Sequence, residues 1–198
     1  MNDFWLIGSW TTPDAYAGDI HDPMSQKSFM WNNNNPYVYS DPSGYDAIVS
    51  VDGNNIRITL PIRMSGGTSD QQLAIKTQIE QQWSGTFGKY SVTTSVTSGD
   101  MNKLDIVDST VRDHASYDAR GHMNSAVVTT ADKDFAWAAG HEAGHLLGLP
   151  DGYSDKTGAY SGYSDNVMGA RGQTGVKEGQ IKAIIDSGQN STISRGPQ

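Results

Sequence analysis

Strict alternation of apolar and polar residues marks one early part of the chain. Residues 47–51 are mostly apolar, and residues 55–64 carry Ile, Leu or Met at every second position, so both segments are predicted strands. Asp52-Gly53 between them favours a tight turn, which makes the pair a hairpin. Pro61 lacks a backbone N–H group and therefore predicts an edge strand or a bulge.

Helical periods and shorter apolar runs follow. A helix is predicted from a cap at Thr68 or Ser69 to about Trp83, because its apolar residues recur every four positions. Asp132 can cap a second helix. The second and third helices are predicted over residues 133–147 and 175–186, further strands over residues 90–97, 103–108 and 125–129, and a Gly- and Tyr-rich loop over residues 150–170.

This order of strands, helix, strands, helix, loop and helix predicts an α/β or α+β domain over residues 46–198. Residues 1–45 differ from it. They hold the asparagine run 32–35 and several prolines, with no sustained period, so we predict turns and irregular structure there. Their aromatic residues argue against a purely disordered segment.

Composition narrows the chemistry. The 198 residues carry a net charge of −8, which argues against a nucleic-acid partner. The chain has no cysteine, so a metal site must use His, Asp or Glu. No apolar run is long enough to span a membrane, and the residues from Met1 to Trp5 do not begin a signal peptide.

One segment carries a pattern typical of metal chemistry. His141 and His145 lie four positions apart on the second helix, so both imidazoles project from one face. Gly148 allows a sharp exit from the helix, and the chain can then bring Asp151 back as a third ligand. Three such ligands leave one tetrahedral position of a zinc ion open. Glu142 lies beside the metal, where it can take a proton from a water molecule.

A simpler interpretation is an amphipathic helix with two surface histidines. It does not explain why Glu142, Gly148 and Asp151 occur together. Asp155 and His114 are weaker alternatives for the third ligand.

The segment from His141 to Asp151 resembles the signature of the metzincin metallopeptidases, His-Glu-x-x-His-x-x-Gly-x-x-His or Asp. Asn166-Val167-Met168-Gly169 resembles their methionine turn, which places Met168 as an apolar support beneath the metal. The resemblance covers roughly residues 46–188. It implies a zinc endopeptidase with one catalytic zinc ion, and Glu142 as general base. Tyr153, Tyr160 and Tyr163 precede Met168 and are interpreted as loop packing or substrate contacts.

The resemblance also implies a fold: a twisted mixed sheet of about five strands, two long helices including the active-site helix, the methionine turn and a C-terminal helix. Two alternatives stay open. One is a catalytically inactive binding module with the metzincin fold. The other is a zinc amidase that acts on peptidoglycan.

Residues 8–45 resemble the C-terminal end of an RHS-repeat-associated core. Asp41-Pro42-Ser43-Gly44 matches its closing element, and Asp22 and Asp41 match the aspartates at which such cores cut themselves. The segment Asp22-Pro23-Met24-Ser25 has serine where that element has its glycine. The resemblance implies a toxin domain, secreted or delivered as an effector. It would be a monomer acting on a protein or peptide, with a cognate immunity protein as partner.

Overall fold

The computed structural model describes residues 46–110, 112–118 and 121–194. The chain divides into two units, Met1–Gly44 and Tyr45–Gln198. The first unit lies outside the described residues, together with Asp22 and Asp41. What the sequence predicts for residues 1–45 therefore stays a prediction.

A mixed sheet forms the centre of the second unit. Its strands follow the order β5-β6-β4-β2-β1-β9, and β3 pairs with β4 to make seven strands. The strands are β1 (Ala47–Asp52), β2 (Asn55–Gly66), β3 (Gly85–Phe87), β4 (Tyr90–Val107), β5 (His114–Tyr117), β6 (Met123–Thr129) and β9 (Asn190–Ser194). A separate two-stranded sheet joins β7 (Tyr153–Ser154) and β8 (Gly158–Ala159).

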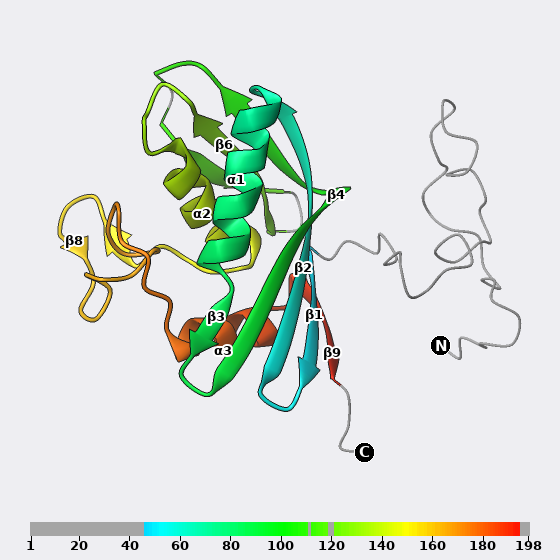
Figure 1. Cartoon of the computed structure of the whole chain (residues 1–198). Coiled ribbons are helices and arrows are strands. Elements are labelled where there is room, and N and C mark those ends of the chain that lie inside the picture. Colours follow the sequence, from blue (N-terminus) through cyan, green and yellow to red (C-terminus); the bar gives the residue numbers. More distant parts are fainter. Residues whose placement is uncertain (1–45, 111, 119–120, 195–198) are drawn as a thin grey trace, which may run out of the picture. The chain divides into compact units, whose positions relative to one another are not determined.

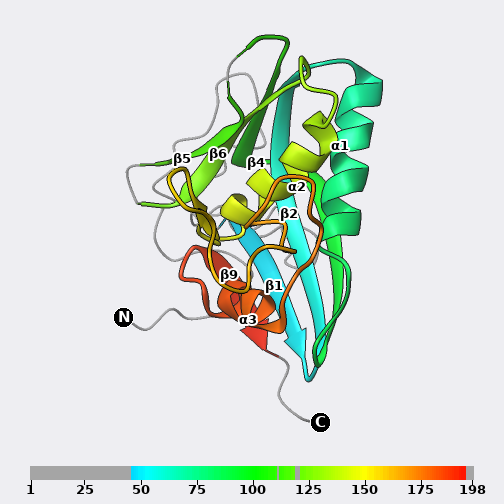
Figure 2. The same cartoon turned by 90° about the vertical axis from the view of Figure 1, so that its left-hand side faces the viewer.

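Three helices pack against the sheet: α1 (Ser69–Gln82), α2 (Phe135–Leu146) and α3 (Glu178–Asp186). Helix α1 lies against α2 and β4, α2 against β6, and α3 against β9 and β1. Figures 1 and 2 show all three helices on the same side of the sheet. Buried and exposed residues alternate along β4, as expected when only one face is covered.

The hairpin predicted between residues 47 and 64 is confirmed, with Asp52 opposite Asn55. The structure corrects the expectation for Pro61. Strand β2 lies inside the sheet, between β4 and β1, so the edge alternative is wrong. The bulge alternative holds, because the β2–β4 register shifts between Pro61 and Ile62. A proline cannot donate to the ladder, and the shift accommodates that missing bond.

The two strands predicted over residues 90–97 and 103–108 are wrong as separate elements. They form the single strand β4, which pairs Thr97 with Pro61 and then Asn102 with Ile62. The extra residues between Thr97 and Asn102 pack over Pro61. A Cβ on Gly99 would lie 2.6 Å from Pro61 Cβ. The expectation of about five strands is also too low, because the sequence pattern did not indicate the short strands β3, β5 and β9.

The N-terminus of α1 is capped as the sequence predicts, whereas the N-terminus of α2 is not. Thr68 caps α1 in a reciprocal capping box with Gln71, as one of the two predicted caps. Asp132 does not cap α2. That helix begins after Asp134, and Asp132 Oδ1 instead accepts the Asp134 N–H group at 3.0 Å. Among the described residues, no helix has the length and apolar character needed to cross a membrane.

Candidate metal centre

The predicted metal ligands come from α2 and from the bend that follows it. His141 and His145 are buried on the helix, which ends at Leu146. Gly148 has a φ of +92°, a backbone conformation that residues with a Cβ rarely adopt. This turn reverses the chain, so that Asp151 returns to the two imidazoles. The side chain of Asp151 is 46% exposed, which leaves the centre open to solvent on one side.

The three donor atoms converge. His141 Nε2 and His145 Nε2 each lie 3.4 Å from Asp151 Oδ1. All three donors lie within 4.8 Å of one another. Ligands about 2.0–2.2 Å from a tetrahedral zinc ion are separated by about 3.3 Å from each other. The separations to Asp151 therefore suit a metal of that size.

Backbone carbonyls determine which ring nitrogens face the centre. His141 Nδ1 lies 2.8 Å from Val167 O, and His145 Nδ1 lies 2.8 Å from Leu149 O. A carbonyl oxygen only accepts, so each Nδ1 carries a hydrogen and each Nε2 atom faces Asp151. Two imidazole nitrogens and a carboxylate oxygen are ligand atoms that zinc takes, and each ring is oriented by the backbone through its other nitrogen. The donor set therefore fits a divalent metal ion.

Glu142 lies next to this group and is nearly completely buried. Within the described part of the chain, its Oε2 atom has no hydrogen-bond partner. Burial first, and then the negative charges of Asp113 and Asp151, raise the pKa of Glu142 to about 8 against a smaller opposing effect of Arg112. Burial also lowers the pKa of His141, which favours its neutral form. A metal ion held by His141, His145 and Asp151 would add positive charge beside the buried Glu142 carboxyl group.

Met168 lies beneath α2 and is fully buried. A Cβ on Gly144 would come within 2.3 Å of Met168 Sδ, so the helix approaches this side chain closely. Asn166 Oδ1 accepts the Met168 N–H group at 2.9 Å, and Met168 O accepts the Gly152 N–H group at 2.7 Å. The structure thus packs Met168 between α2 and the loop after the bend. Its identity as a methionine turn stays a prediction.

Two cavities flank His141 and Glu142. One, of about 200 Å³, lies toward Trp137 and Arg171. The other, of about 470 Å³, is lined by residues that include His145, Asp151 and β5. The two cavities place the candidate centre in the middle of a hollow surface that extends to both sides.

Arg112 and Asp113 line both cavities, and the sequence analysis did not identify them. Asp113 Oδ1 accepts the Thr129 N–H group at 2.7 Å, which fixes it beside β6. Arg112 reaches Asp155 at 3.1 Å and Tyr153 Oη at 3.4 Å. No spacing in the sequence links these two residues to α2, because the sheet topology brings them there.

The weaker alternatives for the third ligand have other contacts. Asp155 pairs with Arg112, and His114 Nδ1 lies 2.9 Å from Arg112 O. Tyr153 lines both cavities, with its ring centroid 6.2 Å from that of His141. Tyr163 packs against the loop backbone at Gly152 and Gly169.

Comparisons with known proteins add little to this geometry. No protein-family model matches the sequence, and no curated protein matches it. Among solved structures the chain is similar to high choriolytic enzyme 1, a hatching enzyme zinc-protease from Oryzias latipes, the medaka fish. The identity is 13% and the TM-score is 0.37, over 60% of this chain and 57% of that one. The chain thus matches little more than half the length of that protein, and a likeness this distant carries no argument about function.

Proposed function

We propose that this chain is a zinc-dependent endopeptidase in which His141, His145 and Asp151 hold one zinc ion and Glu142 is the general base. One observation carries the proposal. Two imidazoles, each oriented by a backbone carbonyl, and the carboxylate that follows the bend after α2 bring their donor atoms within 4.8 Å of one another. Two histidines and one carboxylate form the ligand set of a catalytic rather than a structural zinc site.

A zinc ion held there would polarise the scissile carbonyl and lower the pKa of the attacking water. Glu142 lies beside the three ligands, and its unpartnered Oε2 atom is free to accept the proton of that water. The same carboxyl group then delivers the proton to the leaving amine. Burial of Glu142 keeps bulk water from competing for this atom.

Strand β5 supports a peptide as substrate. It is the last strand in the sheet order, and in the described residues it pairs only with β6. His114, Ala115 and Tyr117 of β5 line the larger cavity beside the metal ligands. An extended peptide can add to such an open edge through backbone hydrogen bonds, which would place a peptide bond near the centre.

The biological part of the proposal comes from the sequence of residues 8–45. We propose a toxin domain of an RHS-type protein, secreted or delivered as an effector and acting as a monomer. Its substrate is a protein or peptide, and a cognate immunity protein protects the producing cell. We also propose that residues 46–198 form a metzincin-like fold in which Met168 supports the metal site.

The variant Glu142→Gln tests the assigned chemistry. An amide cannot accept the proton, so casein hydrolysis should fall by about 10²- to 10⁴-fold while zinc remains bound. Glu80→Gln makes the same chemical change on α1 and should retain activity. Hydrolysis that survives in Glu142→Gln contradicts the role of Glu142. A wild-type protein that cleaves purified cell wall but not casein is the amidase, and one that binds zinc and cleaves neither is the binding module.

A further inference from the structure

The end of α2 leaves two carbonyl groups to be satisfied from elsewhere. The N–H groups of Gly148 and Leu149 fold back onto carbonyls of the last helical turn, in the pattern of a Schellman turn. That turn leaves Leu146 O and Leu147 O without a partner inside the helix. Both residues are fully buried, so water cannot satisfy these oxygens and the protein has to provide donors.

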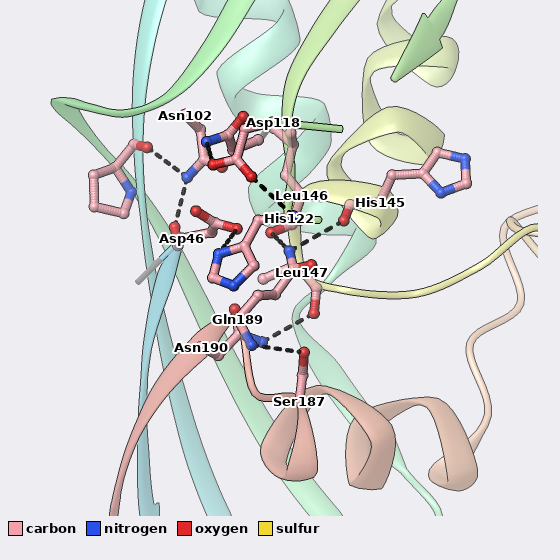
Figure 3. A network of polar contacts seen from close by, with 12 residues as sticks. Asp46, Asn102, Asp118, His122, His145, Leu146, Leu147, Ser187, Gln189 and Asn190 are labelled. Carbon is pink, nitrogen blue, oxygen red and sulfur yellow. Dashed lines mark hydrogen bonds and ion pairs between the residues drawn. The ribbon is translucent and has the colours of Figure 1, made fainter. Parts of the chain in front are cut away.

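Two buried side-chain amides provide them. Gln189 Nε2 lies 3.0 Å from Leu146 O, and Asn190 Nδ2 lies 2.9 Å from Leu147 O. Asn190 Nδ2 also lies 3.0 Å from Ile184 O, in α3. Figure 3 shows Gln189 and Asn190 directly beyond the end of α2, next to α3. We call these two residues the amide clamp.

The amide clamp is itself fixed to the sheet. Gln189 O accepts the Asp46 N–H group at 2.7 Å, and Asn190 is the partner of Ala47 in the parallel ladder. Gln189 of the amide clamp also lies against the bend, because a Cβ on Gly148 would be 3.3 Å from Gln189 Cδ. The sheet edge, the amide clamp and the bend after α2 therefore form one connected unit.

We propose that the amide clamp positions His145 and Asp151 for metal binding, an inference that rests on the proposed function. Leu149, the second residue of the Schellman turn, supplies the carbonyl that orients His145. Asp151 follows two residues later. Without the amide donors, the bend is free to shift, and both ligands lose their fixed positions although neither is changed.

The variants Asn190→Asp and Gln189→Glu test this directly. Each replaces an amide donor by a carboxylate of nearly the same shape, which repels the carbonyl it faces. The dissociation constant for Zn²⁺, measured by competition with a chromophoric chelator, should rise by about 10- to 100-fold, the range found when partners that orient metal ligands are removed. If Asn190→Asp does not fold, Gln189→Glu supplies the measurement, because it loses only one well-formed bond.

Gln82→Glu is the matched control. Gln82 is also buried, and its Nε2 atom donates to Thr174 O at 2.8 Å, away from the amide clamp and from Asp46. This variant should lower the melting temperature but leave the Zn²⁺ dissociation constant unchanged. The inference is overturned if the clamp variants bind Zn²⁺ as tightly as the wild type, or if Gln82→Glu weakens binding equally. A wild-type protein that does not bind Zn²⁺ overturns the proposed function instead.

Discussion

At the scale of single residues, the centre depends on atoms that are not ligands. Val167 O and Leu149 O fix the rings of His141 and His145 so that both Nε2 atoms face inward. Without these acceptors either ring could turn and expose its other nitrogen. The backbone that follows the ligands in sequence is therefore as important to the geometry as the ligands are.

Gly144 and Gly140 both lie on α2, but only Gly144 is in close contact with other side chains. Replacing each by alanine therefore tests that contact against a change in chain conformation alone. A Cβ on Gly144 would lie 2.3 Å from Met168 Sδ and 2.8 Å from Trp83 Cζ2, both in fully buried side chains. Gly144→Ala should therefore lower the free energy of unfolding by about 1–3 kcal/mol through overpacking. Chemical denaturation with urea measures this change.

Gly140→Ala is the control on the same helix. Its Cβ would meet Gln82 and Gln78 at ordinary contact distances of 3.5–3.6 Å. Alanine restricts the unfolded chain without a clash, so this variant should be more stable than the wild type by about 0.5–1 kcal/mol. Two variants with the same effect would contradict the close contact between α2 and Met168.

The convergence of the three proposed ligands was predictable because their geometry is local. The spacing of His141 and His145 fixes a shared helix face, and Gly148 permits the bend toward Asp151. Arg112 and Asp113 were not predictable in this way. Both residues immediately precede β5, a strand that the sequence analysis did not predict, and they reach the cavities because β5 pairs with β6.

At the scale of elements, the helices end in different ways. Helix α1 begins with side chains from its own first turn, since Thr68 Oγ1 accepts the Gln71 N–H group and Gln71 Oε1 accepts the Thr68 N–H group. Helix α2 ends with donors from Gln189 and Asn190, far along the chain. The cap of α1 can be read from the sequence as Thr-x-x-Gln. The contacts at the end of α2 cannot, because they form only when distant parts of the chain come together.

Thr68→Ala removes the capping oxygen of α1. The free energy of unfolding, measured by urea denaturation, should fall by about 1 kcal/mol, because the Gln71 N–H group loses its partner. Casein hydrolysis at a temperature well below unfolding should stay unchanged, since α1 carries none of the proposed ligands. Thr77→Ala, on the exposed side of the same helix, is the control and should not lower stability. Equal losses in both variants would argue against the cap.

The hairpin and the three helices were predictable because periodicity and turn residues act over short distances. The continuity of β4 was not, because the residues that separate the two predicted strands are absorbed as a bulge opposite Pro61. Strand β9 was missed for a related reason. It is short, and it exists through its pairing with β1.

At the scale of the whole domain, the outer strands of the sheet lie beside the larger cavity and beside the end of α2. Strand β5 forms one margin of the larger cavity, and α2 with its bend forms another. At the other end of the strand order, Asn190, the first residue of β9, and Gln189, which precedes it, donate to the end of α2. The two outer strands of the sheet thus both act on the candidate centre, although they are far apart in sequence.

The central claim is that this fold binds a catalytic zinc ion. The most direct measurement is the metal content of protein purified without added zinc, together with casein hydrolysis before and after chelation. We expect one zinc ion per chain, loss of activity on chelation and recovery when zinc is restored. Protein that holds no stoichiometric metal, or that hydrolyses casein equally well after chelation, would contradict the account.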